Sequence, residues 1–405
     1  MIEDRPRSVR GTLSSLVRRV PPRLYGSHGG SIESARADER SRPDSEDEAR
    51  VLDVEATSDG TVREFDVRTL AEDAGLSEDE PCDTLVRTIV RHAETGDVIR
   101  FRGGRFWLRD LHVIETALVV EGEDSTLDFG ESGGVHFRGS HYNGADPPVT
   151  VRAAGPVPRG ERAVIVEETD GFEAGDYVLV ETGYAGWSSR HPLRAGSEYK
   201  CQVARVGRID AGRLVLDRAI ETRFDADDAA IEIHRLEPLE SPVFRSLTTV
   251  GGRIPLRMET CVDGRFERCE VSRYGDYGQR VDYCLGAVYD GSIVADPRSE
   301  DDGRSEAIHV AHSTATTIDH PRVYTCRLGI GLSNGCFGVE ITDPVIRGAS
   351  ERAIATHGDS ITAGGIRLDG DAVEAETDTD GVHPEGCLSS LNAREAATIR
   401  GTTIH

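Results

Sequence analysis

Lysine is almost missing from this sequence of 405 residues, because Lys200 is the only lysine among 47 basic residues. Acidic residues number 72, which leaves a formal net charge of -25 at pH 7. A surface this acidic repels nucleic-acid phosphates, so we expect no DNA or RNA partner. An acidic, lysine-poor chain is typical of salt-loving archaea, where salt screens the self-repulsion. A GC-rich genome also exchanges lysine for arginine, but it does not account for the acidity.

Long apolar runs are also lacking, so the sequence predicts no membrane span. The first residues, Met1 to Pro6, do not open a secretory signal peptide, and no apolar run follows Arg18 and Arg19 as a twin-arginine signal requires. We therefore expect a protein that stays inside the cell or leaves it by another route, for instance within a virus particle.

Several chemical motifs are absent as well. The eight cysteines form no C-x-x-C pair, which speaks against a zinc ribbon and favours small buried residues in a core. No phosphate-binding loop, dinucleotide turn, serine-esterase elbow or H-E-x-x-H helix occurs. The sequence therefore predicts no cofactor, apart from a Ca²⁺ or other divalent ion of the kind that acidic-sugar enzymes hold on carboxylates.

The N-terminal segment 1–50 differs from the rest. Apolar residues within 8–20 follow the spacing of one helical face, and residues 28–50 have the composition of a linker. We expect either a short surface helix or a peg that docks on an acidic partner such as another virion protein. The docking residues would be Val9, Leu13, Leu16 and Val17.

Beyond the linker, residues 51–149 are expected to hold a helix over 83–93, ended by Gly96, and then short strands separated by tight turns. Residues 150–240 predict an inserted β module. Residues 241–405 repeat at intervals typical of the coils of a solenoid. The predicted rungs lie at 264–271, 286–294, 317–324, 338–346 and 397–404.

This order resembles a known superfamily. The helix followed by G-D-V-I-R-F, G-R-F-W-L and V-V-E-G-E-D-S-T-L-D-F is similar to the entry of pectin-lyase-like β-helices. The module segment D-G-F-E-A-G-D-Y-V-L-V looks like insertions in phage-tail and epimerase β-helices. The resemblance implies an all-β right-handed parallel β-helix with an N-terminal capping helix, and a homotrimer similar to viral tail spikes of haloarchaeal type. A cap is needed because an open end exposes core residues and strand edges.

Two groups of residues could bind or process sugars. The first group mixes aromatic and charged side chains in what the sequence presents as one long turn, which suits sugar binding but also fits a structured turn. Its members are Arg273, Tyr274, Asp276, Tyr277, Arg280 and Asp282.

The second group is rich in histidine and could bind metal or catalyse a reaction if its members stack across rungs. Strand alternation predicts that His309 shares a face with Ala307 and Ala311. Hydrogen-bonded rung and turn histidines are the plainer interpretation. The candidates are His309, His312, His357 and Asp359.

The sequence lacks the tight acid cluster of polygalacturonases, and Asp301-Asp302 reads as a solvated turn. We therefore expect a virion-associated spike or fibre, or receptor-binding protein, that binds the surface glycan or glycoprotein of a halophilic host. It would be located at the virion surface or outside the cell. An extracellular polysaccharide lyase, epimerase or hydrolase is the alternative, and an architectural capsid or tail component without ligand is the second. Whether any turnover occurs stays open.

Overall fold

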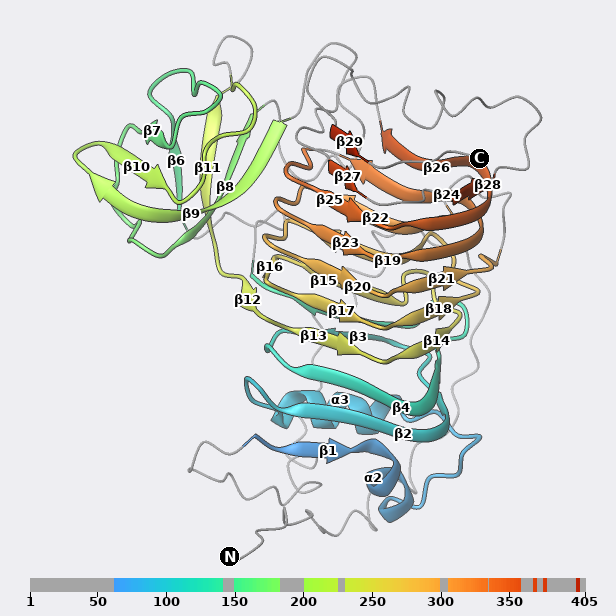
Figure 1. Cartoon of the computed structure of the whole chain (residues 1–405). Helices are drawn as coiled ribbons and strands as arrows, with labels where there is room; N and C mark the ends of the chain where they lie inside the picture. Colours follow the sequence, from blue (N-terminus) through green and yellow to red (C-terminus); the bar gives the residue numbers. More distant parts are fainter. Residues whose placement is uncertain are drawn as a thin grey trace, which may run out of the picture.

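The computed structural model describes residues 62–140, 149–182, 200–224, 230–298, 305–333, 335–357, 367–369, 374–376 and 398–400. Their backbone forms a long solenoid of parallel strands with a smaller antiparallel module at its side (Figure 1). The predicted N-terminal peg and linker lie outside the described residues.

The solenoid begins with strand β1 (Glu64–Asp66), helix α2 (Val67–Asp73) and helix α3 (Asp83–His92). Helix α3 matches the helix predicted over 83–93, and its apolar face buries Leu85 and Ile89 against the first coils. Helix α2 was not predicted. Neither helix in the described part of the chain has the length and apolar character needed to cross a bilayer.

Three stacks of parallel strands make up the solenoid. The first stack comprises β1, the first halves of β2 (Val98–Trp107) and β4 (Val119–Asp128), β13 (Val243–Arg245), β17 (Arg265–Glu267), β20 (Val288–Asp290), β23 (Thr317–Asp319), β25 (Glu340–Thr342), β27 (Arg367–Asp369) and β29 (Thr398–Arg400). The second stack comprises the second halves of β2 and β4, β14 (Thr248–Val250), β18 (Glu270–Ser272), β21 (Ile293–Ala295), the first parts of β24 (Arg322–Ser333) and β26 (Val345–His357), and β28 (Glu374–Glu376). The third stack comprises β3 (Leu111–Ile114), β5 (Gly134–Arg138), β15 (Leu256–Glu259), β19 (Tyr277–Asp282), β22 (Glu306–Ala311) and the later parts of β24 and β26.

The four predicted rungs between residues 264 and 346 each consist of a first-stack strand and a second-stack strand joined by a sharp corner; of the rung predicted at 397–404, the described residues include only β29. The corners between them adopt positive φ at Arg268, Gly291, His320 and Asp343. The all-β parallel β-helix predicted from the sequence is therefore the fold of the chain.

Side chains at equal positions in successive rungs stack on one another inside the solenoid. The rings of Phe244 and Phe266 have centroids 5.4 Å apart, and those of Phe266 and Tyr289 are 4.7 Å apart and nearly parallel. Seven cysteines fall in the described residues, and all of them are buried. They behave as the small buried residues that the sequence predicted.

The module is a six-stranded antiparallel sheet in the order β6-β11-β8-β9-β10-β7. An antiparallel bridge between Ala153 and Val166 joins its two edges, so the sheet closes on itself. Its strands are β6 (Thr150–Arg152), β7 (Ala163–Ile165), β8 (Tyr177–Thr182), β9 (Lys200–Asp210), β10 (Arg213–Leu216) and β11 (Ile231–Leu236).

The module packs on one corner of the solenoid through a small apolar cluster of its own. Leu179 and Leu236 of the module meet Tyr283 and Leu285 of the solenoid in that cluster. The backbone N–H of Val203 also donates to the Thr314 hydroxyl oxygen at 3.0 Å. Strand β12 (Leu239–Glu240) leads the chain back from the module into the coils and pairs in parallel with β16 (Cys261–Val262), a corner strand of the next rung.

Candidate functional site

The third stack carries a line of polar side chains on its outer surface. The strand register aligns Arg257 with Arg280 and Arg280 with His309 on successive rungs. It also aligns Glu259 with Asp282. Strands β15, β19 and β22 lie one above another, so residues distant in sequence become neighbours (Figure 1).

Asp282 is the most buried charge of this line, with 1% of its side chain exposed. It accepts hydrogen bonds from Arg257 Nε at 2.9 Å and from Arg280 Nη2 at 2.8 Å. Burial alone raises the pKa of Asp282, but Arg280 and Arg257 outweigh burial and hold its pKa well below the usual value. Asp282 is therefore an anion that fixes two guanidinium groups.

The arginines and one tyrosine form the accessible part of the line. Arg257 and Arg280 keep 23% and 21% of their side chains exposed. The Arg280 guanidinium lies over the Tyr277 ring, 4.6 Å from its centroid. The half-buried Tyr277 ring also packs against the His309 imidazole, at 4.5 Å between centroids. An aromatic surface and two hydrogen-bond donors are thus held in fixed relation.

His309 pairs with Glu306 from the start of the same strand, with His309 Nδ1 2.5 Å from Glu306 Oε2. Burial lowers the pKa of His309, although Glu306 opposes that shift. The next rung places Gly331 beside His309. A Cβ at Gly331 would overlap the Glu306 carboxylate, so glycine at this position makes room for the pair.

His312 ends the line at the corner of the solenoid on which the module packs. Its ring stacks on Tyr283 with centroids 4.3 Å apart and an interplanar angle of 9°. Burial lowers the pKa of His312, and Asp282, 3.9 Å from its Nδ1, acts in the opposite direction. We call the whole group the β19–β22 cluster: Arg257, Glu259, Tyr277, Arg280, Asp282, Glu306, His309 and His312.

Three residues of the first predicted group fall outside this cluster. Arg273 is exposed in a turn with φ of 54°, and Asp276 is bound to Arg253 at 2.5 Å. Tyr274 is fully buried in the solenoid core, so its ring cannot stack on a sugar. The segment is also not one long turn, because 277–282 forms strand β19.

The second predicted group divides in the same way. His309 and His312 belong to the cluster. His357 ends strand β26, but its side chain is not among those described, and Asp359 lies outside the described residues. The sequence reasoning missed Arg257, Glu259 and Glu306. Only the rung register brings them beside Arg280 and His309, although the i, i+3 spacing of Glu306 and His309 was visible in the sequence.

No protein-family profile matches the sequence, and no curated protein matches it. Among solved structures, the tailspike protein gp49 from Pseudomonas phage LKA1 superposes with a TM-score of 0.57 at 16% sequence identity. The chain has the parallel β-helix fold of a phage tailspike. The superposition covers 74% of this chain and 50% of that one, so this chain spans half the length of that tailspike.

Other solved structures resemble the chain less closely. The Gp54 tailspike of Acinetobacter baumannii bacteriophage AP22, in complex with capsular saccharide, gives a TM-score of 0.44 at 12% identity over 84% of this chain and 76% of that one. PfbA, a surface adhesin of Streptococcus pneumoniae, gives a TM-score of 0.42 at 9% identity, and the match covers 80% of this chain and 70% of that one. Scores this low add nothing to the assignment of the fold.

Proposed function

We propose that this chain is a virion-associated spike or fibre protein that binds surface glycan or glycoprotein of a halophilic host. Its glycan site is the β19–β22 cluster. The observation that carries the proposal is the partly exposed Tyr277 ring beneath the Arg280 guanidinium, with Arg280 and Arg257 both held by the buried Asp282. Sugars are recognised by ring stacking and by donors preset for their hydroxyl groups.

The cluster divides into contact residues and positioning residues. Tyr277, Arg257 and Arg280 keep exposed surface and contact the glycan. Asp282 and Glu306 are buried, so they act by orienting the arginines and His309.

The charge of the cluster indicates the kind of glycan. The two arginines, Arg257 and Arg280, are already balanced by Glu259 and Asp282, which lie on the same two rungs. A site built for a strongly anionic polymer would leave positive charge in excess. We therefore expect a neutral or weakly charged glycan.

The proposed assembly is a homotrimer on the virion, with residues 1–50 docking on other virion proteins. The tailspike fold supports this proposal by analogy only, because one fold hosts many functions.

Binding to an array of surface glycan fractions from salt-loving hosts, in molar salt, tests the proposal. Tyr277→Ala should lower retention at least tenfold, because the stacking surface is lost. Tyr324→Ala removes a half-buried tyrosine of the second stack and should leave retention unchanged. Equal retention by wild type and Tyr277→Ala would show that the β19–β22 cluster is not the glycan site. If the wild-type chain binds no glycan at all, the protein would instead be an architectural component.

Cleavage of the bound glycan is the second candidate function. The Glu306–His309 pair favours it, because burial keeps a neutral imidazole beside an orienting carboxylate, which is the arrangement of a proton-transfer group. The alternative role of the pair is to hold adjacent rungs together.

A mass spectrum of the glycans before and after incubation with the purified chain separates these roles. Shortened or unsaturated fragments, lost in His309→Asn while glycan retention persists, would establish turnover. Unchanged glycans would leave binding as the function of the cluster.

A further inference from the structure

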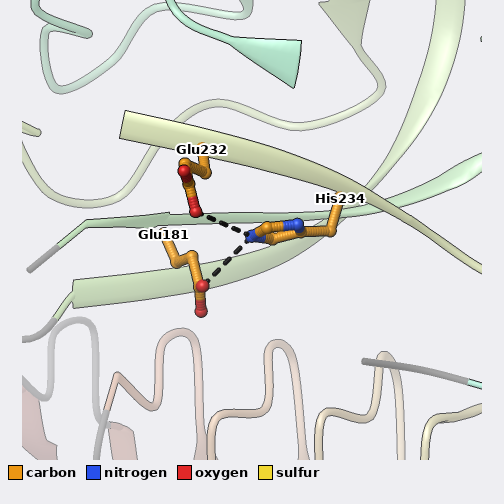
Figure 2. Close-up of side chains that lie close together, drawn as sticks. All are labelled: Glu181, Glu232 and His234. Atoms are coloured by element: carbon orange, nitrogen blue, oxygen red, sulfur yellow. Dashed lines mark hydrogen bonds and ion pairs between the residues drawn. The ribbon is translucent and has the colours of Figure 1, made fainter. Parts of the chain in front are cut away.

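A second group of side chains converges on the sheet of the module, near enough to the His312 end of the β19–β22 cluster for Glu181 to act on the pKa of His312. Glu181 projects from strand β8, and Glu232 and His234 project from strand β11 (Figure 2). The antiparallel register places Glu232 directly opposite Glu181. His234 is two residues further along β11 and therefore lies on the same face as Glu232.

The donor atoms of the three residues lie close together, although somewhat wider apart than the donors of a bound divalent ion. His234 Nε2 lies 3.1 Å from Glu181 Oε1 and 3.7 Å from Glu232 Oε2. One ligand atom from each of the three residues lies within 4.8 Å of the others. Zinc–ligand bonds of about 2.0–2.2 Å place tetrahedral or octahedral donors about 3.0–3.5 Å from one another.

The orientation of the imidazole is compatible with a bound cation, because the Thr150 hydroxyl can accept from Nδ1 when Nε2 binds the ion. His234 Nδ1 lies 2.9 Å from the Thr150 hydroxyl oxygen. The tautomer that donates from Nδ1 to Thr150 leaves a lone pair on Nε2, directed at the two carboxylates. A second hydrogen bond of this kind is the usual support of a metal-binding histidine.

Electrostatics favours a cation at the same point. Like charges directly opposite each other on a sheet destabilise the strand pair, and burial strengthens the repulsion. Glu181 and His234 are only 3% and 1% exposed. A divalent ion between the carboxylates converts the repulsion into attraction.

We propose that Glu181, Glu232 and His234 bind one Zn²⁺ ion that ties strand β8 to strand β11. Imidazole suits zinc and other transition metals, whereas Ca²⁺ and Mg²⁺ prefer oxygen ligands alone. Glu232 is partly exposed and leaves an open side for a water ligand. Strands β8 and β11 also carry Leu179 and Leu236, so the ion stabilises the seat of the module on the solenoid.

The test uses the full chain after treatment with EDTA and dialysis. Added ZnCl₂ should be retained at one equivalent per chain, measured by elemental analysis. It should raise the melting temperature by about 5 °C when free zinc is near 100 times its dissociation constant. Glu232→Gln and His234→Asn should each lose the retained zinc and the thermal shift.

His112→Asn is the matched control. His112 is also a buried histidine, but it pairs with the single carboxylate of Asp83 at 2.9 Å. The variant should lower the melting temperature with and without zinc and keep one equivalent of the metal.

Two outcomes overturn the proposal. Failure of the wild-type chain to retain zinc would show that the three side chains only hydrogen-bond to one another and hold no metal. A thermal shift with CaCl₂ but not with ZnCl₂ would show that the site binds a cation through oxygen ligands and not through the His234 imidazole.

Discussion

Some buried carboxylates in the described part of the chain are each held by several donors. Asp97 accepts from the Arg63 guanidinium at 2.6 Å and from the Glu94 backbone N–H at 2.7 Å. Burial raises the pKa of Asp97, but these bonds outweigh it and bring its pKa below the usual value. The pKa of Asp83 is lowered in the same way. Burial raises it, but hydrogen bonds from His112 and from two backbone N–H groups outweigh burial. Such groups stabilise the fold only while they are ionised.

Asp97→Asn should therefore cost about 3 kcal/mol of unfolding free energy at pH 7, because Arg63 loses its buried partner. The wild-type contribution should persist above pH ~5. It should fade as the pH drops below the unfolded pKa of ~4 toward the lower folded value. Urea titrations between pH 7 and pH 3 measure both chains. A variant that loses as much stability as the wild type on acidification would contradict this role of Asp97.

Gly331→Ala tests the space reserved beside the Glu306–His309 pair. The added methyl should push Glu306 from His309, cost about 1–3 kcal/mol through overpacking and reduce glycan retention. Gly155→Ala is the control, since a Cβ there meets nothing within 4 Å. Thermal melts and glycan retention measure the two effects. Full glycan retention in Gly331→Ala would show that the Glu306–His309 pair plays no part in glycan binding.

Alternation along a strand was a poor guide to single residues of the third stack. It predicted that His309 and Ala307 share a face. Ala307 instead lies in the solenoid core with Ile308, whereas His309 lies on the outer side of the third stack. The neighbouring strand has the same irregularity, since Gly278 and Gln279 are both buried. A bend that turns two successive residues inward is set by the coil and leaves no signal in the alternation of one strand.

At the scale of the element, interior ladders link one rung to the next. Phe266 stacks between Phe244 and Tyr289, so its ring contributes to two inter-rung contacts. Such ladders have the regular spacing that made the rungs visible in the sequence.

Phe266→Ala should destabilise the solenoid by about 3–5 kcal/mol, since it opens a cavity in the middle of the ladder. Val62→Ala, at a side chain that is 66% exposed, should change stability by less than about 0.5 kcal/mol. Chemical denaturation of both variants measures the difference. A small loss for Phe266→Ala would mean that the coils repack around the gap.

Helix α3 and the rungs after residue 264 could be predicted because each depends on local periodicity and turn residues. The limits of strand β19 could not be predicted, because the charged and aromatic residues that face outward there hide the alternation of apolar and polar residues. Five of the eight residues of the β19–β22 cluster were found from the sequence. Arg280, Asp282 and His309 stand out locally, whereas Arg257 and Glu306 gain meaning only from the pairing of rungs.

At the scale of the whole molecule, charge is the dominant feature. The formal net charge of -25 produces self-repulsion that salt screens. Paired rows on the first stack, such as Arg100 with Glu121 and Arg245 with Glu267, relieve only part of it.

We expect the melting temperature to rise by several degrees between low salt and about 2 M salt. The rise should be similar for NaCl and KCl, since screening depends on ionic strength. Differential scanning calorimetry at several salt concentrations measures it. A melting temperature independent of salt would leave the acidic composition without a role in stability.

The central claim is that the β19–β22 cluster binds glycan, and paired binding isotherms test it most directly. Arg280→Ala removes a contact from the cluster, and Arg245→Ala removes an equivalent arginine, paired with Glu267, from the first stack. With folding of both variants verified by circular dichroism, the account predicts at least tenfold weaker glycan binding for Arg280→Ala and wild-type binding for Arg245→Ala. Equal affinities for all three chains would contradict it.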